Sequence, residues 1–163
     1  MNNQEKWDRR FVDLARHFSS FSKDISTKVG SIITDNKRRL ISAGYNGLSL
    51  HTLDDPNILN NRTKKLEKII HGEINSILFA KQDLENCQLY LWPFLSCSRC
   101  TSIIIQSGIT RVVAPINNNE RWAASIDMSK QMYSEAGVEV ILLDGYFVDK
   151  NGWEMKPSPL IIE

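Results

Sequence analysis

The sequence is organised around two short stretches, HGE at residues 71–73 and PFLSCSRC at residues 93–100. A histidine and two thiols three residues apart are ligands that zinc prefers in proteins. In a catalytic site such a set leaves the fourth position to water, and a nearby carboxylate that is not a ligand moves the protons of that water. The pattern therefore predicts a catalytic zinc site with His71, Cys97 and Cys100 as ligands and Glu73 as the acid/base group.

The cysteines also allow two other kinds of site. A closed structural zinc site needs a fourth strong ligand, and Cys87 is the only thiol left, so a Cys₃His site remains open. A redox pair is the second alternative, although it would leave Glu73 without a role. With three cysteines, two of them in a C-x-x-C, we do not expect a disulfide framework.

Four further motifs occur in the order and spacing of one family: KDISTKVG (23–30), GYNG (44–47), HGEINSILFA (71–80) and IIIQSGI (103–109). From about Trp7 to Val140 the chain resembles the deoxycytidylate (dCMP) deaminases of the cytidine deaminase superfamily, whose signature is H-x-E followed by P-C-x-x-C. The resemblance implies zinc-dependent hydrolysis of dCMP to dUMP with release of ammonia, and a homo-oligomer. Ser96 stands where the signature has proline, and SLH (49–51) stands where the family often has Pro-Arg-Gly.

Several polar side chains are candidate substrate contacts. Asn46 carries a donor and an acceptor, which suits a sugar hydroxyl or a base edge, but Asn-Gly is also a common turn pair. The resemblance assigns substrate binding to the motif that contains Asn46. A 5′-phosphate needs donors and cations, and the candidates near the inferred site are Ser26, Thr27, Lys28 and Arg121. Trp122 would either cover the base or anchor a helix, and exposed charge is the alternative for Lys28 and Arg121.

Composition limits the class of protein. A chain of 163 residues suits a single domain, with residues 144–163 as a C-terminal tail. Twenty basic and nineteen acidic residues give a formal charge of +1, which supports neither an extended nucleic-acid surface nor a membrane surface. We therefore expect a small-molecule partner, which the resemblance implies is a pyrimidine nucleotide. No signal peptide is apparent at the polar start and no apolar run approaches about 20 residues, so we expect a cytoplasmic protein.

Two other classes of function remain open. The first is a deaminase for another ring: a free nucleoside, a modified cytidine nucleotide or an adenosine in tRNA. A tRNA substrate calls for a basic face, which the balanced charge does not provide. The second is a catalytically silent relative that binds nucleotides, against which the presence of Glu73 argues.

Periodicity predicts the elements around these motifs. Aromatic residues at three- and four-residue steps predict a helix near residues 4–21, and β-rich runs at 29–34 and 39–45 predict a hairpin. Further strands are expected at 88–92, 111–114 and 138–143, and further helices at 97–106 and 119–136. This order indicates a three-layer α/β/α sandwich with a mixed sheet of about five strands, the fold that the resemblance also implies.

The remaining segments are less regular. Residues 48–62 read as a long polar loop that we place beside the site as a rim or lid, and His51, Asp54 and Asp55 within it could form a second metal cluster. Periodicity allows one helix from 64 to 80, whereas the resemblance starts a new helix at His71. In that helix we expect Ile74, Ile77 and Leu78 to form the apolar stripe, with Asn75 and Ser76 facing polar surroundings. The apolar terminus at 160–162 is expected to dock, for example on a neighbouring subunit.

Overall fold

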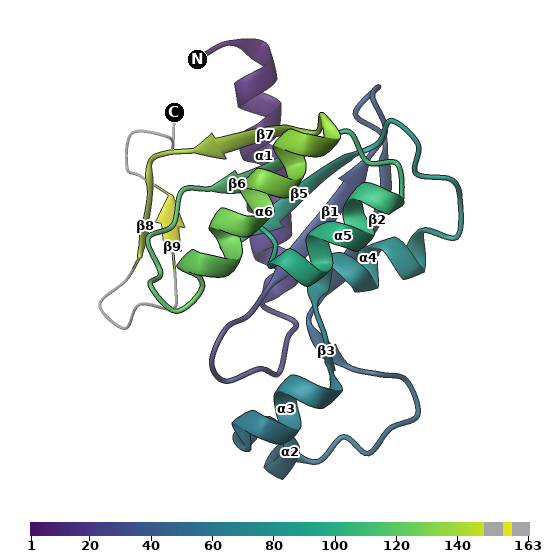
Figure 1. The fold of residues 1–163 in the computed structure, drawn as a ribbon, viewed down its shortest axis with the longest axis vertical. Helices are drawn as coiled ribbons and strands as arrows, with labels where there is room; N and C mark the ends of the chain where they lie inside the picture. The colour runs from purple at the N-terminus through teal and green to yellow at the C-terminus, as the bar shows by residue number, and fades with distance from the viewer. Residues whose placement is uncertain (149–154, 158–163) are drawn as a thin grey trace.

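A five-stranded mixed sheet forms the centre of the protein (Figure 1). The computed structural model describes residues 1–148 and 155–157. Its strands lie in the order β2 (Leu40–Tyr45), β1 (Gly30–Thr34), β5 (Gln88–Trp92), β6 (Arg111–Pro115) and β7 (Glu139–Leu143). β1 pairs antiparallel with β2 and with β5, whereas β5–β6 and β6–β7 are parallel. The predicted hairpin and the predicted mixed sheet are both confirmed.

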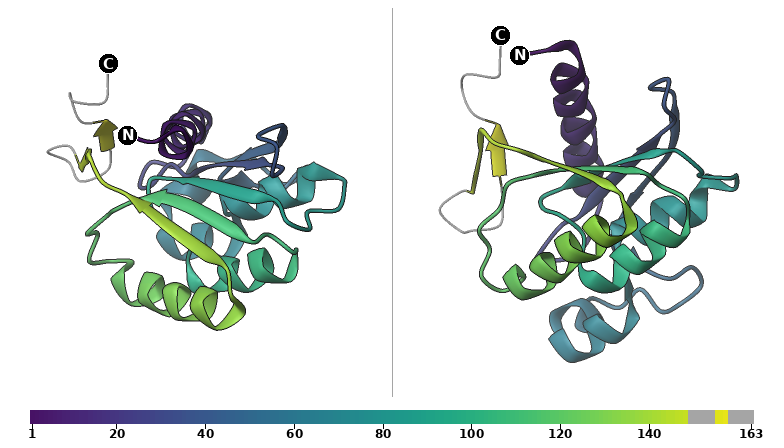
Figure 2. Two further views of the ribbon diagram at one scale, coloured as in Figure 1. Left: turned by 90° about the horizontal axis from the view of Figure 1, so that it is seen from above. Right: turned by 45° about the horizontal axis from the view of Figure 1, so that its top comes forward.

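Helices cover both faces of the sheet, as the views in Figure 2 show. Helix α1 (Asn3–Ser19) packs on one face, and α4 (Gly72–Ala80), α5 (Ser98–Gln106) and α6 (Ala123–Ala136) lie on the other. Alternation along β1 divides the core: Ile32 packs on the α1 side and Ile33 on the opposite side, and both are fully buried. The three-layer α/β/α sandwich expected from the sequence is therefore the observed fold.

Two glycines allow helices to lie directly against the sheet. A Cβ at Gly30 would come within 1.8 Å of the carbonyl oxygen of Ala15 in α1. A Cβ at Gly44 would lie 2.5 Å from the backbone nitrogen of Ser76 in α4. Because these neighbours are backbone atoms that cannot rotate away, only glycine fits at either position. Gly44 thus seats the helix that follows His71 directly on β2.

The start of α4 follows the resemblance and not the periodicity. Strand β4 (Ile69–Ile70) pairs with β3 (Gly47–Leu48) and interrupts the helical pattern, so the new helix begins after His71. The predicted apolar stripe of α4 is wrong in part. Ser76 is fully buried, whereas Leu78 is 52% exposed. The close approach at Gly44 explains this result, since only a small side chain fits between α4 and the sheet.

The predicted loop at 48–62 contains a helix that the sequence analysis missed. Helix α2 (Pro56–Asn60) has Asp55 as its N-cap and proline in its first turn, which is a common way for a helix to begin. Helix α3 (Arg62–Lys68) follows at once, and the two helices project from the sheet layers (Figure 1).

The C-terminal part differs from the prediction as well. The last helix begins at Ala123 and not at 119. Within the expected tail, β8 (Tyr146–Val148) pairs antiparallel with β9 (Met155–Pro157). The apolar terminus at 160–162 lies outside the described residues. In the part of the chain that the structure describes, no helix has the length and apolar character needed to cross a bilayer.

Candidate metal and active site

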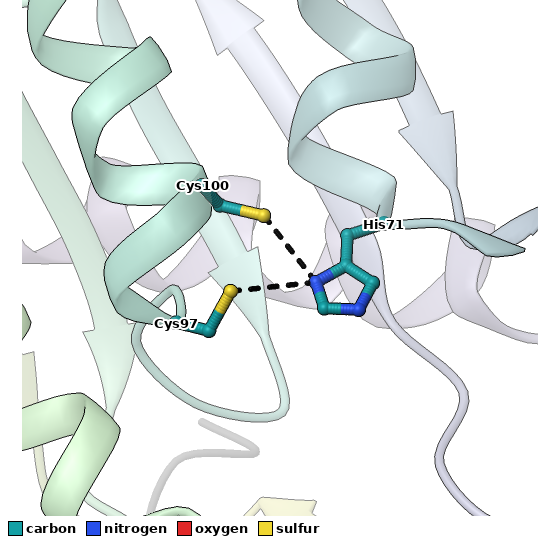
Figure 3. A group of neighbouring side chains, drawn as sticks. All are labelled: His71, Cys97 and Cys100. Atoms are coloured by element: carbon teal, nitrogen blue, oxygen red, sulfur yellow. Dashed lines mark hydrogen bonds between the residues drawn. The ribbon is translucent and has the colours of Figure 1, made fainter. Parts of the chain in front are cut away.

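Two helix N-termini bring the predicted metal ligands together. His71 is the N-cap residue of α4 and Cys97 that of α5, and neither side chain caps its own helix. Cys100 follows in the first turn of α5. The Nδ1 atom of His71 lies 3.6 Å from Sγ of Cys97 and 3.3 Å from Sγ of Cys100 (Figure 3). All three ligand atoms lie within 4.8 Å of one another, as a shared ion requires.

These distances fit tetrahedral zinc. Bonds of about 2.3 Å to sulfur and about 2.0–2.1 Å to nitrogen, at tetrahedral angles, place sulfur and nitrogen about 3.5 Å apart. The two separations from His71 Nδ1 lie close to this value. The three side chains therefore suit zinc both in their chemistry and in their spacing.

Hydrogen bonds among the three ligand side chains shift their pKa values. Hydrogen bonding with Cys97 raises the pKa of His71 to about 9. A hydrogen bond from Cys100, helped by His71, lowers the pKa of Cys97 to about 4. The pKa of Cys100 is raised, because its thiol donates to Cys97 and is buried. A metal held by both sulfurs would displace the proton of Cys100, because cysteine binds metal as thiolate.

Glu73 lies in the first turn of α4 and is 4% exposed. Burial raises the pKa of its carboxyl group. Its Oε2 atom has no hydrogen-bond partner within the described structure. A buried carboxylate oxygen without a partner is rare, which makes this oxygen a candidate contact for a bound molecule. Glu73 also lines a cavity next to the three ligands.

The cavity has about 620 Å³ of space between atoms, a volume that includes open solvent at its mouth. It brings most of the predicted site residues together: Ser26, Thr27, Asn46, His71, Glu73, Cys97, Arg121 and Trp122. Lys28 is exposed and does not line it. Two further buried polar atoms of cavity residues, Oγ1 of Thr27 and Nε1 of Trp122, lack partners in the described structure. These atoms could form hydrogen bonds with a polar ligand in the cavity.

Asn46 holds one wall of this cavity in place. Its Oδ1 accepts from the backbone N–H of Val29 at 2.8 Å, and its Nδ2 donates to the carbonyl oxygen of Thr27 at 2.8 Å. Both polar ends of the side chain are thus used to fix residues 27–29. A direct contact of Asn46 with substrate remains a prediction.

Four charged or aromatic residues that line the cavity are absent from the candidates named from the sequence. Arg62 and Lys65 reach the cavity from α3, and Asp24 and Phe94 also line it. Lys65 Nζ donates to Asp24 Oδ1 at 3.0 Å, and both side chains are buried. Phe94 pairs with Trp122 at a ring-centroid distance of 6.2 Å. Phe94 could have been found from its place in the cysteine motif. Nothing in the charged run around Lys65 indicates that this lysine is buried.

The alternative metal sites receive no support. The group of potential ligands does not include Cys87, which is buried in the hydrophobic core. In the predicted second cluster, Asp54 pairs with Lys23 and Asp55 caps α2. Residues 48–52 line a second cavity beside the first, which agrees with their expected place near the site.

Comparison with known proteins identifies the family. Residues 5–116, which include all three ligands and Glu73, match the family model described as the cytidine and deoxycytidylate deaminase zinc-binding region. The chain belongs to this deaminase family. It is therefore an enzyme, a hydrolytic deaminase, and the resemblance seen in the sequence is confirmed.

Individual relatives support this family assignment. The chain is 42% identical over 141 residues to an "uncharacterized deaminase in luxG 3'region" of Aliivibrio fischeri, covering 85% of this chain and 94% of the relative. It is 30% identical to a probable deoxycytidylate deaminase of Caenorhabditis elegans, covering 83% of this chain and 68% of that relative.

Among solved structures, the fold matches a dCMP deaminase of cyanophage S-TIM5 with a TM-score of 0.63 at 21% identity, over 88% of this chain and all of that one. A structure from a study of tRNA:A34 deaminases matches with a TM-score of 0.57 at 19% identity, over 83% of this chain and 98% of that one.

Proposed function

We propose that this deaminase is zinc-dependent and hydrolyses the amino group of a cytosine nucleotide, converting dCMP to dUMP with release of ammonia. The observation that carries the proposal is the cavity itself. His71, Cys97 and Glu73, whose Oε2 has no partner in the described structure, line it together with an aromatic pair and two arginines, and all three ligand atoms lie within 4.8 Å of one another.

Glu73 is the proposed acid/base residue. Zinc held by His71, Cys97 and Cys100 would lower the pKa of a water molecule to about 7 and so supply hydroxide at neutral pH. Glu73 takes the proton of the attacking water and gives it to ring nitrogen N3, and then takes the proton of the new C4 hydroxyl and gives it to the N4 amino group. The C4–O bond forms, the C4–N4 bond breaks, and one water is consumed for each ammonia released. Burial raises the pKa of the Glu73 carboxyl group, which favours its uptake of a proton.

The aromatic pair is the proposed binding surface for the base. Phe94 and Trp122 form an apolar part of the wall, next to His71 and Cys97. The unpartnered Nε1–H of Trp122 is a donor, and the hydroxyl of Thr27 can donate or accept. Both groups would gain hydrogen bonds from a nucleotide that carries oxygen acceptors, which supports a polar ligand over an apolar one.

The 5′-phosphate is proposed to lie near Arg62 and Arg121, with Ser26 close by. Both arginines line the cavity, and they come from different parts of the chain. Charge-assisted hydrogen bonds contribute roughly 1.5–3 kcal/mol each, so removing one arginine should lower kcat/KM for dCMP by about 10- to 100-fold. Lys28, which the sequence suggested, is the comparison, because it does not line the cavity.

The test is ammonia release from dCMP, CMP, dCTP, deoxycytidine, cytosine and AMP. We expect dCMP to be the preferred substrate. Arg62→Ala and Arg121→Ala should lower kcat/KM for dCMP but leave that for deoxycytidine nearly unchanged, and Lys28→Ala should affect neither. Equal kcat/KM for dCMP and deoxycytidine in the wild type would refute the nucleotide assignment. Preference for AMP would favour an adenine deaminase in its place.

A further inference from the structure

The segment Ser96–Ser98 carries the first cysteine ligand. It leads into α5 without a capping bond from the Cys97 side chain, and it has serine where the family signature has proline. Proline fixes its own φ and would restrict the backbone before the ligand. In this chain something else has to hold the segment in place.

One face of α6 contacts every residue of this segment except the ligand itself. Ser125, Ser129 and Tyr133 are spaced by four residues, so they lie along one side of the helix. We call these three residues the hydroxyl stripe. The backbone N–H of Ser98 donates to Oγ of Ser125 at 3.0 Å. Oγ of Ser129 donates to the carbonyl oxygen of Ser96 at 2.8 Å, and Oη of Tyr133 lies 2.6 Å from Oγ of Ser96.

The hydroxyl groups form a chain with one direction. Thr101 Oγ1 donates to the carbonyl oxygen of Cys97 at 2.9 Å, so it accepts from Ser96 Oγ at 2.8 Å. Ser96 has then used its proton and accepts from Tyr133. Burial raises the pKa of Tyr133, which keeps the phenol protonated as the first donor. All three side chains are at most 1% exposed, so water does not compete for these bonds.

We propose that the hydroxyl stripe is a positioning device that holds Cys97 for the metal and so controls how firmly zinc is retained. This inference rests on the proposed zinc site. The stripe acts through the backbone on both sides of the ligand: Tyr133 reaches the Cys97 carbonyl through Ser96 and Thr101, and Ser125 holds the next N–H. Partners that orient metal ligands commonly change metal affinity by about 10- to 100-fold when they are removed.

The experiment measures zinc release to a chromogenic chelator and the absorption spectrum of the Co²⁺-substituted protein. Tyr133→Phe and Ser125→Ala should release zinc about tenfold faster or more, and should shift the Co²⁺ bands. Tyr90→Phe is the control, because it removes the hydroxyl of another fully buried tyrosine, one that donates to Gln88 and does not contact the ligand segment. Ser125→Thr keeps a hydroxyl and should restore the wild-type release rate.

Two results would overturn the inference, and they can be told apart. If the wild type binds zinc, and the stripe variants release it at the same rate as Tyr90→Phe, the stripe has no positioning role and the zinc site stands. If the wild type binds no zinc, the inference fails together with the proposed zinc dependence. Should Tyr133→Phe not fold, Ser125→Ala decides, because Ser125 is only partly buried.

Discussion

Replacing Lys65 with methionine should destabilise the protein strongly, although the residue lies within a run of charges on a projecting helix. Lys65 Nζ lies 3.0 Å from Asp24 Oδ1, and the two side chains are 7% and 4% exposed. Removing one partner of a buried ion pair costs about 3–5 kcal/mol, since it leaves the other charge buried and uncompensated. The same oxygen of Asp24 still accepts from the backbone N–H groups of Ser26 and Thr27, at 2.7 and 3.2 Å. We therefore expect a loss near the lower end, about 3 kcal/mol.

Urea unfolding followed by circular dichroism measures this loss. A loss of about 3 kcal/mol corresponds to a melting temperature lower by about 6–12 °C in a protein of this size. Lys64→Met is the matched control, because Lys64 is exposed on the same helix and its side chain makes no hydrogen bond in the described structure. Asp24→Asn combined with Lys65→Met should recover part of the loss, since it removes the uncompensated charge. The reasoning is refuted if Lys65→Met unfolds at the same urea concentration as Lys64→Met.

Further predictions concern the metal, the packing and the assembly. Cys97→Ala should purify with almost no zinc and Cys87→Ala with about one zinc per chain, by metal analysis; loss of zinc in Cys87→Ala would indicate the closed structural site. Gly44→Ala should lose about 1–3 kcal/mol in urea unfolding, because its Cβ would overlap the backbone of α4, and a wild-type midpoint would contradict the close packing. Leu78 and Phe79 are 52% and 53% exposed on α4, an apolar surface that an oligomer would cover. Light scattering at micromolar concentration should therefore give a multiple of the monomer mass for the wild type. The mass of Phe79→Asp should be smaller than that of the wild type. A monomeric wild type would refute the assembly.

The sequence predicts the features of the fold that depend on local pattern. The hairpin of β1 and β2 follows from two β-rich runs around a turn, and each strand begins one residue after the predicted start and ends at the predicted residue. The three ligands and Glu73 are indicated by residue types that have few uses other than metal chemistry in this spacing. The residues that the motifs name accordingly lie together in the structure.

What the sequence does not predict depends on partners far along the chain. Lys65 is buried because Asp24, 41 residues away, receives its ammonium group. Ser76 is buried and Leu78 exposed because Gly44 lets α4 lie against β2, a contact that the helix's own periodicity does not contain. Arg62 reaches the cavity because α3 forms part of its wall through Arg62, Lys65 and Leu66. Lys28 is the opposite case. It directly follows Ser26 and Thr27 in the sequence, but it does not line the cavity as they do.

The most direct test of the account compares wild type and Glu73→Gln in zinc content and in ammonia release from dCMP. We expect about one zinc per chain in both proteins, because Glu73 is not among the ligands. Wild type should deaminate dCMP, and the variant should be slower by at least about a hundredfold, because its amide cannot carry the proton. A variant that retains activity within about tenfold, or a zinc-loaded wild type that releases no ammonia from dCMP, would contradict the central claim.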